Sequence, residues 1–299
     1  MDKEARIKLA VQKSGRLTDP SVDLLVRCGL KLARGKDQLM GYGENMPLDL
    51  LFVRDDDIPD LVQEDVCDLG LVGLNVLEEK RLQLAARGAA ARFEALRTLD
   101  FGRCRLSLAV PVEHAYAGPA SLRGKRIATT YPYLLGRFLR QVGVEAEIVT
   151  LSGAVEIAPR LGRADLICDL VSTGSTLQAN HLREVETVLE SHAVLIRTPV
   201  PLPADKSDWV ERLLLRVEGV QQVRESKYIM LHAPRSALPA IRRLLPGSES
   251  PTIIPLEGST DRVAVHAVCR ENVFWETLES LKKAGASALL VLPVEKMLA

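Results

Sequence analysis

The chain contains the run Ala164-Asp165-Leu166-Ile167-Cys168-Asp169-Leu170-Val171-Ser172-Thr173-Gly174-Ser175-Thr176-Leu177. The apolar part, Asp165–Val171, predicts a buried strand. A turn rich in hydroxyl groups follows it, and Ser175–Leu182 predicts a helix. A strand that passes through a short turn into a helix is typical of an α/β sheet.

The turn in this run has the features of an anion-binding loop. Gly174 permits a positive φ or a close approach of the main chain to a ligand, so successive N–H groups can point into one concavity. The start of the following helix favours an anion as well. Hydroxyl donors come from Ser172, Thr173, Ser175 and Thr176. The plain alternative is a helix cap with spare hydroxyls. Because the turn has no lysine, it is not a Walker A loop.

Strand and helix patterns alternate on both sides of this run. Before it, strands are predicted at Ile7–Val11, Asp49–Val53, Asp68–Val72, Arg105–Val110, Lys125–Thr129 and Glu145–Leu151, and a helix at Ala154–Leu161. After it, residues 185–196 read as strand-like and Asp208–Glu225 as a helix. We therefore expect two α/β lobes with a ligand cleft between them: lobe I from 1–104 and 184–224, and lobe II from 105–183.

Residues 225–299 have a pattern of their own. The predicted order is strand Tyr228–Ala233, helix Ser236–Leu245, strands Thr252–Leu256 and Arg262–Val268, helix Glu271–Ala284 and strand Ala288–Pro293. This βαββαβ order is the ferredoxin-like arrangement. Such a terminal module often serves regulation or assembly, although a fold alone does not establish a function.

Composition narrows the class of protein. Thirty-nine basic residues balance thirty-nine acidic ones, so net charge does not argue for a nucleic-acid or membrane partner. The five cysteines form no C-x-x-C pair, and the five histidines show no metal-ligand spacing. No apolar run approaches the roughly 18 residues that span a bilayer. With no signal-peptide pattern at the start, we expect a cytoplasmic protein.

Further candidate ligand groups follow other predicted strands. Lys13, Arg16 and Arg54 are cations that can neutralise phosphates, and their plain alternative is solvated turns. The stretch Asp68–Asn75 contains glycines that let the flat face of a ligand approach the main chain, or it is simply tight strand–helix packing. Glu156 can accept hydrogen bonds from ribose hydroxyls, as can Asp169, or it is an exposed helical glutamate.

The chain resembles the long form of the ATP phosphoribosyltransferase family, which catalyses the first step of histidine biosynthesis. The resemblance rests on blocks that occur in this order along nearly the whole chain: Gln12–Leu17, Glu44–Pro47, Val53–Pro59, Asp68–Gly70, Leu99–Gly102, Lys125–Thr129, Gly153–Glu156, Asp165–Leu177, Arg224–Tyr228, Ser250–Leu256 and Val291–Met297.

This resemblance implies a fold and a reaction. The fold is two periplasmic-binding-protein-like lobes with an ACT-like C-terminal domain. The reaction converts ATP and 5-phosphoribosyl-1-pyrophosphate into phosphoribosyl-ATP and pyrophosphate, with Mg²⁺ as cofactor. L-Histidine binds the C-terminal domain and inhibits, and the family forms dimers and hexamers. No metal ligands are assigned to particular residues.

The resemblance also assigns residues. It implies that Ser172–Thr176 bind the 5-phosphate of the donor and that Asp169 and Glu156 bind its ribose hydroxyls. Leu170 and Val171 also line the donor site. Lys13, Arg16 and Arg54 face the pyrophosphate or triphosphate, and Asp68, Leu69 and Gly70 line the nucleotide. The residues that contact the inhibitor histidine are implied to be Ser250, Thr252 and His232. At the position of His232 some relatives carry an acidic residue. The loop has one acid before it, whereas common phosphoribosyltransferases have two.

Two other interpretations remain open from the residues alone. The first is a non-catalytic two-lobe protein that binds a small molecule and carries a regulatory domain. A secreted receptor of that kind needs a signal peptide, and a DNA-binding regulator needs a basic helix-turn-helix, and neither pattern occurs. The second is a different enzyme that acts on phosphates, such as a kinase, but the sequence lacks the lysine-bearing loop that phosphoryl transfer usually uses.

Overall fold

The structure is a computed structural model that describes residues 6–35, 38–222, 226–245 and 250–297. The chain forms two compact units, Met1–Trp209 and Val210–Ala299. The boundary between them falls inside helix α6 (Ala204–Gln222). The predicted domain boundary at 224/225, and the predicted end of this helix at Glu225, lie outside the described residues.

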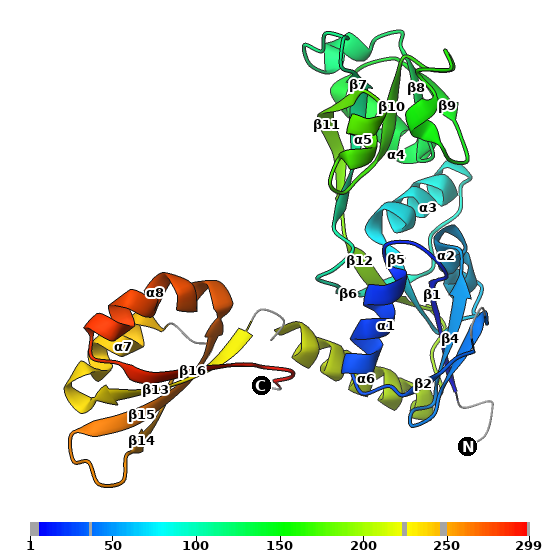
Figure 1. The fold of residues 1–299 in the computed structure, drawn as a ribbon. Coiled ribbons are helices and arrows are strands. Elements are labelled where there is room, and N and C mark those ends of the chain that lie inside the picture. The colour runs from blue at the N-terminus through cyan, green and yellow to red at the C-terminus, as the bar shows by residue number, and fades with distance from the viewer. Residues whose placement is uncertain (1–5, 36–37, 223–225, 246–249, 298–299) are drawn as a thin grey trace. The chain divides into compact units, whose positions relative to one another are not determined.

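The first unit contains a seven-stranded sheet, the core of lobe I (Figure 1). Its strand order is β2-β3-β4-β1-β5-β12-β6, and β1 runs parallel to both β4 and β5. The strands predicted at Ile7–Val11, Asp49–Val53 and Asp68–Val72 are confirmed as β1, β4 and β5. The elements are β1 (Ile7–Gln12), α1 (Thr18–Arg27), β2 (Leu32–Ala33), β3 (Met40–Gly43), β4 (Leu48–Val53), η2 (Asp55–Asp57), α2 (Ile58–Gln63), β5 (Leu69–Gly73), α3 (Leu74–Ala86), β6 (Glu94–Thr98) and β12 (Ala193–Arg197).

A five-stranded sheet forms the core of lobe II, in the order β11-β7-β10-β8-β9. Strand β10 is parallel to β8, which is parallel to β9, while β7 is antiparallel to both of its neighbours. The elements are β7 (Cys104–Pro111), η3 (Pro119–Leu122), β8 (Arg126–Thr129), α4 (Pro132–Val142), β9 (Glu147–Thr150), η4 (Val155–Ile157), β10 (Leu166–Val171), α5 (Ser175–Ala179) and β11 (Leu182–Ser191).

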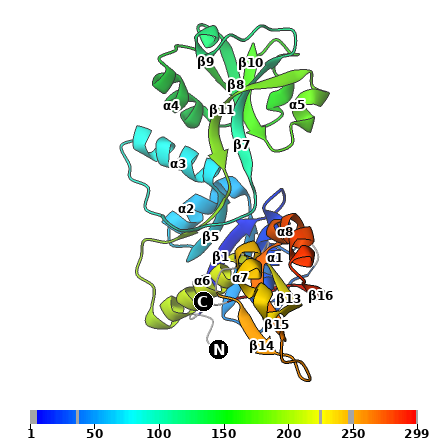
Figure 2. The ribbon, with the colours of Figure 1, turned by 90° about the vertical axis from the view of Figure 1, so that its left-hand side faces the viewer.

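Helices cover both faces of this second sheet (Figure 2). On one face Leu134 and Leu135 of α4 pack with Leu106, Ile127 and Leu166. On the other face the α5 side chain Leu177 packs with a second set of buried residues, which includes Val155, Ala158, Ala109, Ala128 and Ile167. The alternation of inward-facing apolar residues along each strand produces these two cores.

The chain passes twice between the two sheets. The first crossing joins β6 to β7, and the second joins β11 to β12. Main-chain hydrogen bonds tie the crossings together, from Leu99 N to Ala193 O (2.8 Å) and from Ala193 N to Phe101 O (3.0 Å). The predicted return to lobe I at residue 184 is therefore too early: β11 pairs antiparallel with β7, so lobe II continues to Ser191.

Two predicted helices of lobe II are much shorter than the sequence indicates. In place of Ala154–Leu161 the structure has a single turn, η4, because Ala154 adopts a left-handed φ of 50° directly before it and Pro159 supplies no N–H. The helix predicted at Ser175–Leu182 ends at Ala179, because His181 is left-handed (φ 56°) and Leu182 already pairs with Pro111 in the sheet.

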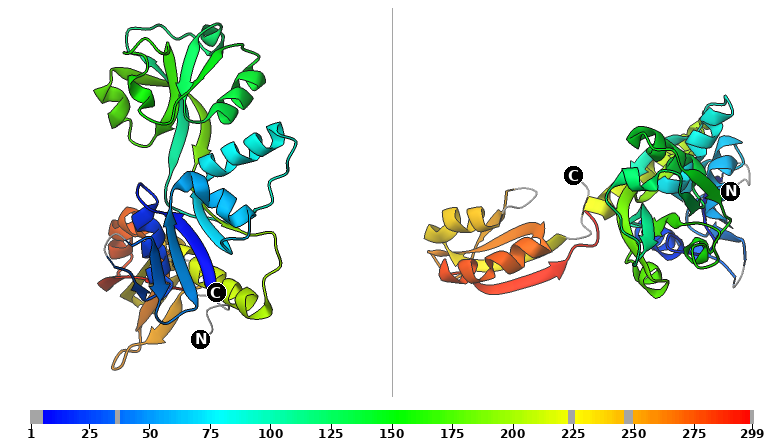
Figure 3. Two further views of the ribbon diagram at one scale, coloured as in Figure 1. Left: turned by 90° about the vertical axis from the view of Figure 1, so that its right-hand side faces the viewer. Right: turned by 90° about the horizontal axis from the view of Figure 1, so that it is seen from above.

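The second unit confirms the predicted βαββαβ module. Its sheet has the order β14-β15-β13-β16 with antiparallel pairing throughout (Figure 3). The elements are β13 (Ser226–Pro234), η5 (Arg235–Ala237), α7 (Leu238–Leu244), β14 (Thr252–Pro255), β15 (Arg262–Arg270), α8 (Glu271–Lys283) and β16 (Ser287–Pro293). Its core includes Ile229, Leu231, Ile241, Val265 and Leu281.

Candidate active site in the first unit

The loop after β10 lines a cavity of about 260 Å³ together with Glu156. Gly174 has the left-handed φ of 84° that the sequence suggests. Among the described residues, the main-chain N–H groups of Thr173, Gly174 and Thr176 meet no protein acceptor. These donors, with the four hydroxyls, suit a ligand with several anionic oxygens. Since α5 has only five residues, its dipole adds little, and the candidate anion site consists of the loop itself.

Asp169 and Glu156 lie on the wall of the same cavity. Asp169 accepts a hydrogen bond from the N–H of Leu170 at 2.8 Å. Burial raises the pKa of the Asp169 carboxyl, the Leu170 N–H lowers it, and the charge of Glu156 raises it again. The two carboxylates are thus near enough to interact, and both can accept hydroxyl hydrogen bonds from one ligand.

The loop 172–176, which we call the donor loop after the ligand that the family resemblance implies, shares its sheet edge with Tyr131. Strands β8, β9 and β10 are parallel, so the segments that follow them, which hold Tyr131, Glu156 and the loop, lie at one edge. In open α/β sheets this carboxyl edge is where ligands bind. In lobe I the corresponding edge carries Lys13 and Arg54, which follow the parallel neighbours β1 and β4. The N–H of Lys13 donates to the carbonyl of Val53 at 2.7 Å.

A hydrogen-bond network joins the two edges. Asn75, at the start of α3 and 1% exposed, donates its amide to the Tyr131 hydroxyl at 2.9 Å. Its oxygen accepts from Arg16 at 3.1 Å and from Ser191 at 2.8 Å. A Cβ on Gly73 would lie 2.5 Å from that oxygen, so a side chain at this position would displace the Asn75 amide from the network. The network holds Arg16 at the place where the lobes meet.

Glu79 of α3 makes a second connection between the lobes. Its carboxylate accepts hydrogen bonds from the N–H groups of Tyr133 (2.9 Å) and Leu134 (2.8 Å), in the first turn of α4. Burial raises the pKa of Glu79, and these two N–H groups lower it. Beside it is a cavity of about 410 Å³, lined in part by Asp56, Asp57, Glu79 and Tyr131.

The predicted cations are only partly brought together. Lys13 and Arg54 share one sheet edge, and Arg16 reaches Asn75. Among the described residues, no hydrogen bond or ion pair joins any of the three to the donor loop. The sequence analysis did not identify Glu79, Tyr131 and Ser191 as site residues, and Asn75 appeared in it only as the end of the stretch Asp68–Asn75. Nothing local marks Ser191.

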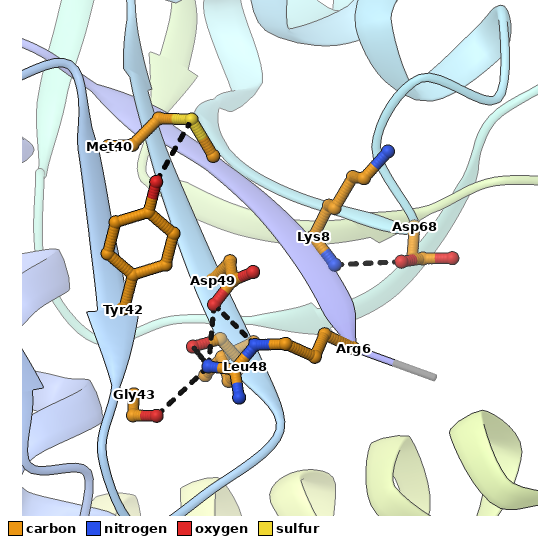
Figure 4. Close-up of polar contacts among 8 residues, drawn as sticks. All are labelled: Arg6, Lys8, Met40, Tyr42, Gly43, Leu48, Asp49 and Asp68. Carbon is orange, nitrogen blue, oxygen red and sulfur yellow. Dashed lines mark hydrogen bonds and ion pairs between the residues drawn. The ribbon is translucent and has the colours of Figure 1, made fainter. Parts of the chain in front are cut away.

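The structure does not support a nucleotide contact by Asp68–Gly70. These residues lie at the amino end of β5, away from the carboxyl edge, and Leu69 and Gly70 are buried. Asp68 pairs with Lys206 of α6 at 2.9 Å. It also accepts a hydrogen bond from the N–H of Lys8 at 2.7 Å, as Figure 4 shows. A buried carboxylate with these partners has a structural role.

In the second unit, two of the three residues predicted to contact histidine line one cavity and the third does not. Ser250 and Thr252 line a cavity of about 330 Å³ with Tyr228 and His266, and His232 is not among its lining residues. The Tyr228 hydroxyl is hydrogen-bonded to Nδ1 of His266. His232 pairs with Ala264 farther along the sheet.

Two α/β lobes that meet at their carboxyl edges, with N–H and hydroxyl donors on one and cations on the other, define a two-lobed α/β protein whose candidate site suits an anionic ligand. The chain belongs to the ATP phosphoribosyltransferase family: the model of that family matches residues 54–219, and the model of its C-terminal domain matches 224–296. Its members are pentosyltransferases.

One solved structure of this family agrees with the assignment. The chain is similar to the ATP phosphoribosyl transferase (HisG:HisZ) complex from Thermotoga maritima, with 27% identity and a TM-score of 0.58, over 71% of this chain and 96% of that one. The alkanesulfonate-binding protein SsuA from Xanthomonas axonopodis pv. citri has 16% identity and a TM-score of 0.45, over 72% and 74%. No helix within the described residues is long and apolar enough to cross a membrane.

Proposed function

We propose that this chain transfers the phosphoribosyl group of 5-phosphoribosyl-1-pyrophosphate to N1 of the adenine of ATP and releases pyrophosphate. The observation that carries this proposal is the loop 172–176, with free N–H groups and hydroxyls around one cavity, in a chain of this family. The 5-phosphate occupies the loop. Asp169 and Glu156 accept hydrogen bonds from the ribose hydroxyls.

The chemistry needs no catalytic base. N1 of adenine has a lone pair and attacks without first losing a proton. The bond to pyrophosphate breaks as the bond to N1 forms, so charge grows on the leaving group and on the sugar. The protein then contributes orientation and preset charges. Lys13, Arg16 and Arg54 supply the positive edge for the pyrophosphate or triphosphate, which their placement after β1 and β4 supports.

Mg²⁺ is expected with the substrates. Among the described residues, no group of three or more His, Cys, Asp or Glu side chains forms a metal cage. Mg²⁺ commonly binds to substrate phosphates with one or two carboxylates. When bound in that way it offsets charge on the phosphates, and we assign it no ligand in this chain.

The reaction is tested by mixing the full-length protein with ATP, the donor, Mg²⁺ and pyrophosphatase, and following product absorbance. Thr176→Ala should weaken donor binding by roughly 1.5–3 kcal/mol, as expected for a lost hydrogen bond to a charged group. Gln178→Ala is the matched control, because Gln178 is exposed on the same helix and does not line the cavity. No product from the unmodified protein would refute the proposal and favour the non-catalytic binding protein.

For regulation, we propose that L-histidine binds the second unit and inhibits the enzyme. The cavity beside Ser250 and Thr252 is the best-supported place, because Tyr228 and His266 add polar groups to it. Histidine should raise the melting temperature of the full chain. Thr252→Val should reduce that rise, and His232→Ala should not. A reduction by His232→Ala alone would place the histidine site farther along the sheet.

We also propose that the protein is cytoplasmic and that it forms a homo-oligomer, a dimer or a hexamer. Light scattering tests the size of the oligomer.

A further inference from the structure

A second cavity, of about 440 Å³, lies at the opposite edge of the five-stranded sheet from the donor loop. It is formed where β8 and β10 begin, around Lys125, Arg126 and Asp165, and where the chain enters β11 at Leu182. Strand β10 therefore has this cavity at its amino end and the donor loop at its carboxyl end. The volume falls within the range of small-molecule pockets.

The cavity has an excess of positive charge. Its lining contains the cations Lys125, Arg126 and Arg160 and the carboxylates Glu113 and Asp165. Arg126 is committed to Asp165, with a side-chain ion pair at 3.0 Å and a main-chain hydrogen bond at 2.8 Å. Within the described parts of the chain, neither Lys125 Nζ nor the Arg160 guanidinium has a hydrogen-bond or ion-pair partner. Two cations are thus available to a ligand.

Imidazole and amide groups complete the lining. His114, His181 and Asn180 all border the cavity. His181 holds a left-handed φ of 56°, which is uncommon for a non-glycine residue. The main chain fixes this conformation, since the N–H of His181 donates to Gln178 O at 3.1 Å and its carbonyl accepts from Val112 N at 3.0 Å. Such strained residues are concentrated at binding sites.

We propose that this cavity is a second ligand site that binds a small phosphorylated compound. Guanidinium, ammonium and imidazole groups are all donors that suit phosphate oxygens. The cavity has room for an organic group beside the phosphate. None of its lining residues lines the donor cavity, so the two sites are separate.

A short path connects this site to the donor loop. The carbonyl of Thr176 accepts hydrogen bonds from both the side-chain amide (3.0 Å) and the main-chain N–H (3.2 Å) of Asn180. Thr176 lines the donor cavity and Asn180 lines the second one, at the two ends of α5. A ligand that engages Asn180 therefore changes donor affinity. This link rests on the proposed donor role of the loop.

Binding is tested without any activity measurement. In the full-length protein, imidazole NMR signals of His114 and His181 are assigned with His114→Gln and His181→Gln, and glycerol 3-phosphate is titrated. We expect saturable shifts of both signals, and affinity at least about tenfold weaker in Lys125→Gln/Arg160→Gln. Arg163→Gln, an exposed neighbour outside the lining, and Thr176→Ala should retain the affinity. Absent shifts, or equal affinity in the double variant, would overturn the site. Shifts with succinate and not with glycerol 3-phosphate would overturn the ligand class.

The link to the donor loop is tested separately. The KM for the donor is measured at increasing glycerol 3-phosphate in the unmodified protein and in Lys125→Gln/Arg160→Gln. We expect the KM for the donor to depend less strongly on glycerol 3-phosphate in the double variant than in the unmodified protein. The dependence that remains in the double variant reflects competition of glycerol 3-phosphate with the donor in the donor cavity. The same dependence in both proteins would overturn the link. An inactive enzyme with intact NMR titration would instead refute the proposed function.

Discussion

Asp169 shows how one carboxylate is prepared for a ligand. Burial and the nearby Glu156 raise its pKa, and one N–H, that of Leu170, opposes them. An ionised group that is partly removed from water and has few protein partners costs stability. Ribose hydroxyls would supply the missing donors, so the group gains its hydrogen bonds when the donor binds.

The proposed role of Asp169 predicts an acid limb in the donor KM. The ionised form accepts the ribose hydrogen bonds, so donor affinity is full above the pKa of Asp169 and falls as pH decreases through it. Because this pKa is raised, the fall begins above the ordinary aspartate value of about 3.9. Asp169→Asn should bind the donor more weakly and lack this limb. Titration of the donor's own phosphates is common to both proteins, so identical pH profiles would contradict the role.

Asp68 should affect stability and leave ATP binding unchanged. It is 7% exposed, and replacing it with Asn leaves Lys206 of α6 without its partner. Breaking a buried pair typically costs about 3–5 kcal/mol. Glu94→Gln, which breaks a surface pair with Arg197, should cost less than about 1 kcal/mol. Urea unfolding and the KM for ATP measure both effects. A raised KM with unchanged stability would restore the nucleotide role.

At the scale of elements, local patterns predicted the buried strands of the first unit and missed elements that have no apolar pattern of their own. Strands such as β1 and β10 are apolar runs between turn signals, so they could be read directly. Helix α3 was missed, since only its first turn, around Val76 and Leu77, is buried and no apolar stripe runs along it. The site divides in the same way. The donor loop is local, whereas the contact of Asn75 with Ser191 joins residues 116 positions apart, which no local pattern contains.

Helix α3 should stabilise α4 through Glu79. The carboxylate satisfies two N–H groups in the first turn of α4, so Glu79→Gln removes the charge and one of the acceptors. Losing a cap of this kind costs roughly 0.5–2 kcal/mol. Glu78→Gln is the control on the same helix, because its pairs with Arg137 (3.4 Å) and Arg81 (3.7 Å) are longer and partly exposed. Thermal unfolding of the two variants measures the difference, and equal losses would refute the capping role.

At the scale of the first unit, the proposed site is split between two lobes. The donor loop follows β10 of the five-stranded sheet, and the cations Lys13 and Arg16 follow β1 of the seven-stranded sheet. A transfer reaction requires both substrates in one geometry, so whatever fixes the crossings between the sheets also fixes the reacting atoms. The crossing at Phe101–Gly102 is next to Leu17, which directly follows Arg16.

Gly102→Ala should therefore impair both stability and activity. Gly102 has a left-handed φ of 69°, and an added Cβ would lie 2.2 Å from Cδ2 of the buried Leu17. Gly88→Ala is the matched control, with φ of 72° and nothing within 4 Å of the added Cβ. Both variants carry the left-handed strain of roughly 1–2 kcal/mol, and only Gly102→Ala adds overpacking of about 1–3 kcal/mol. Displacing Leu17 also moves the main chain that holds Arg16, so kcat/KM should fall only in Gly102→Ala. Equal unfolding midpoints and equal kcat/KM in the two variants would show that this crossing does not position the site.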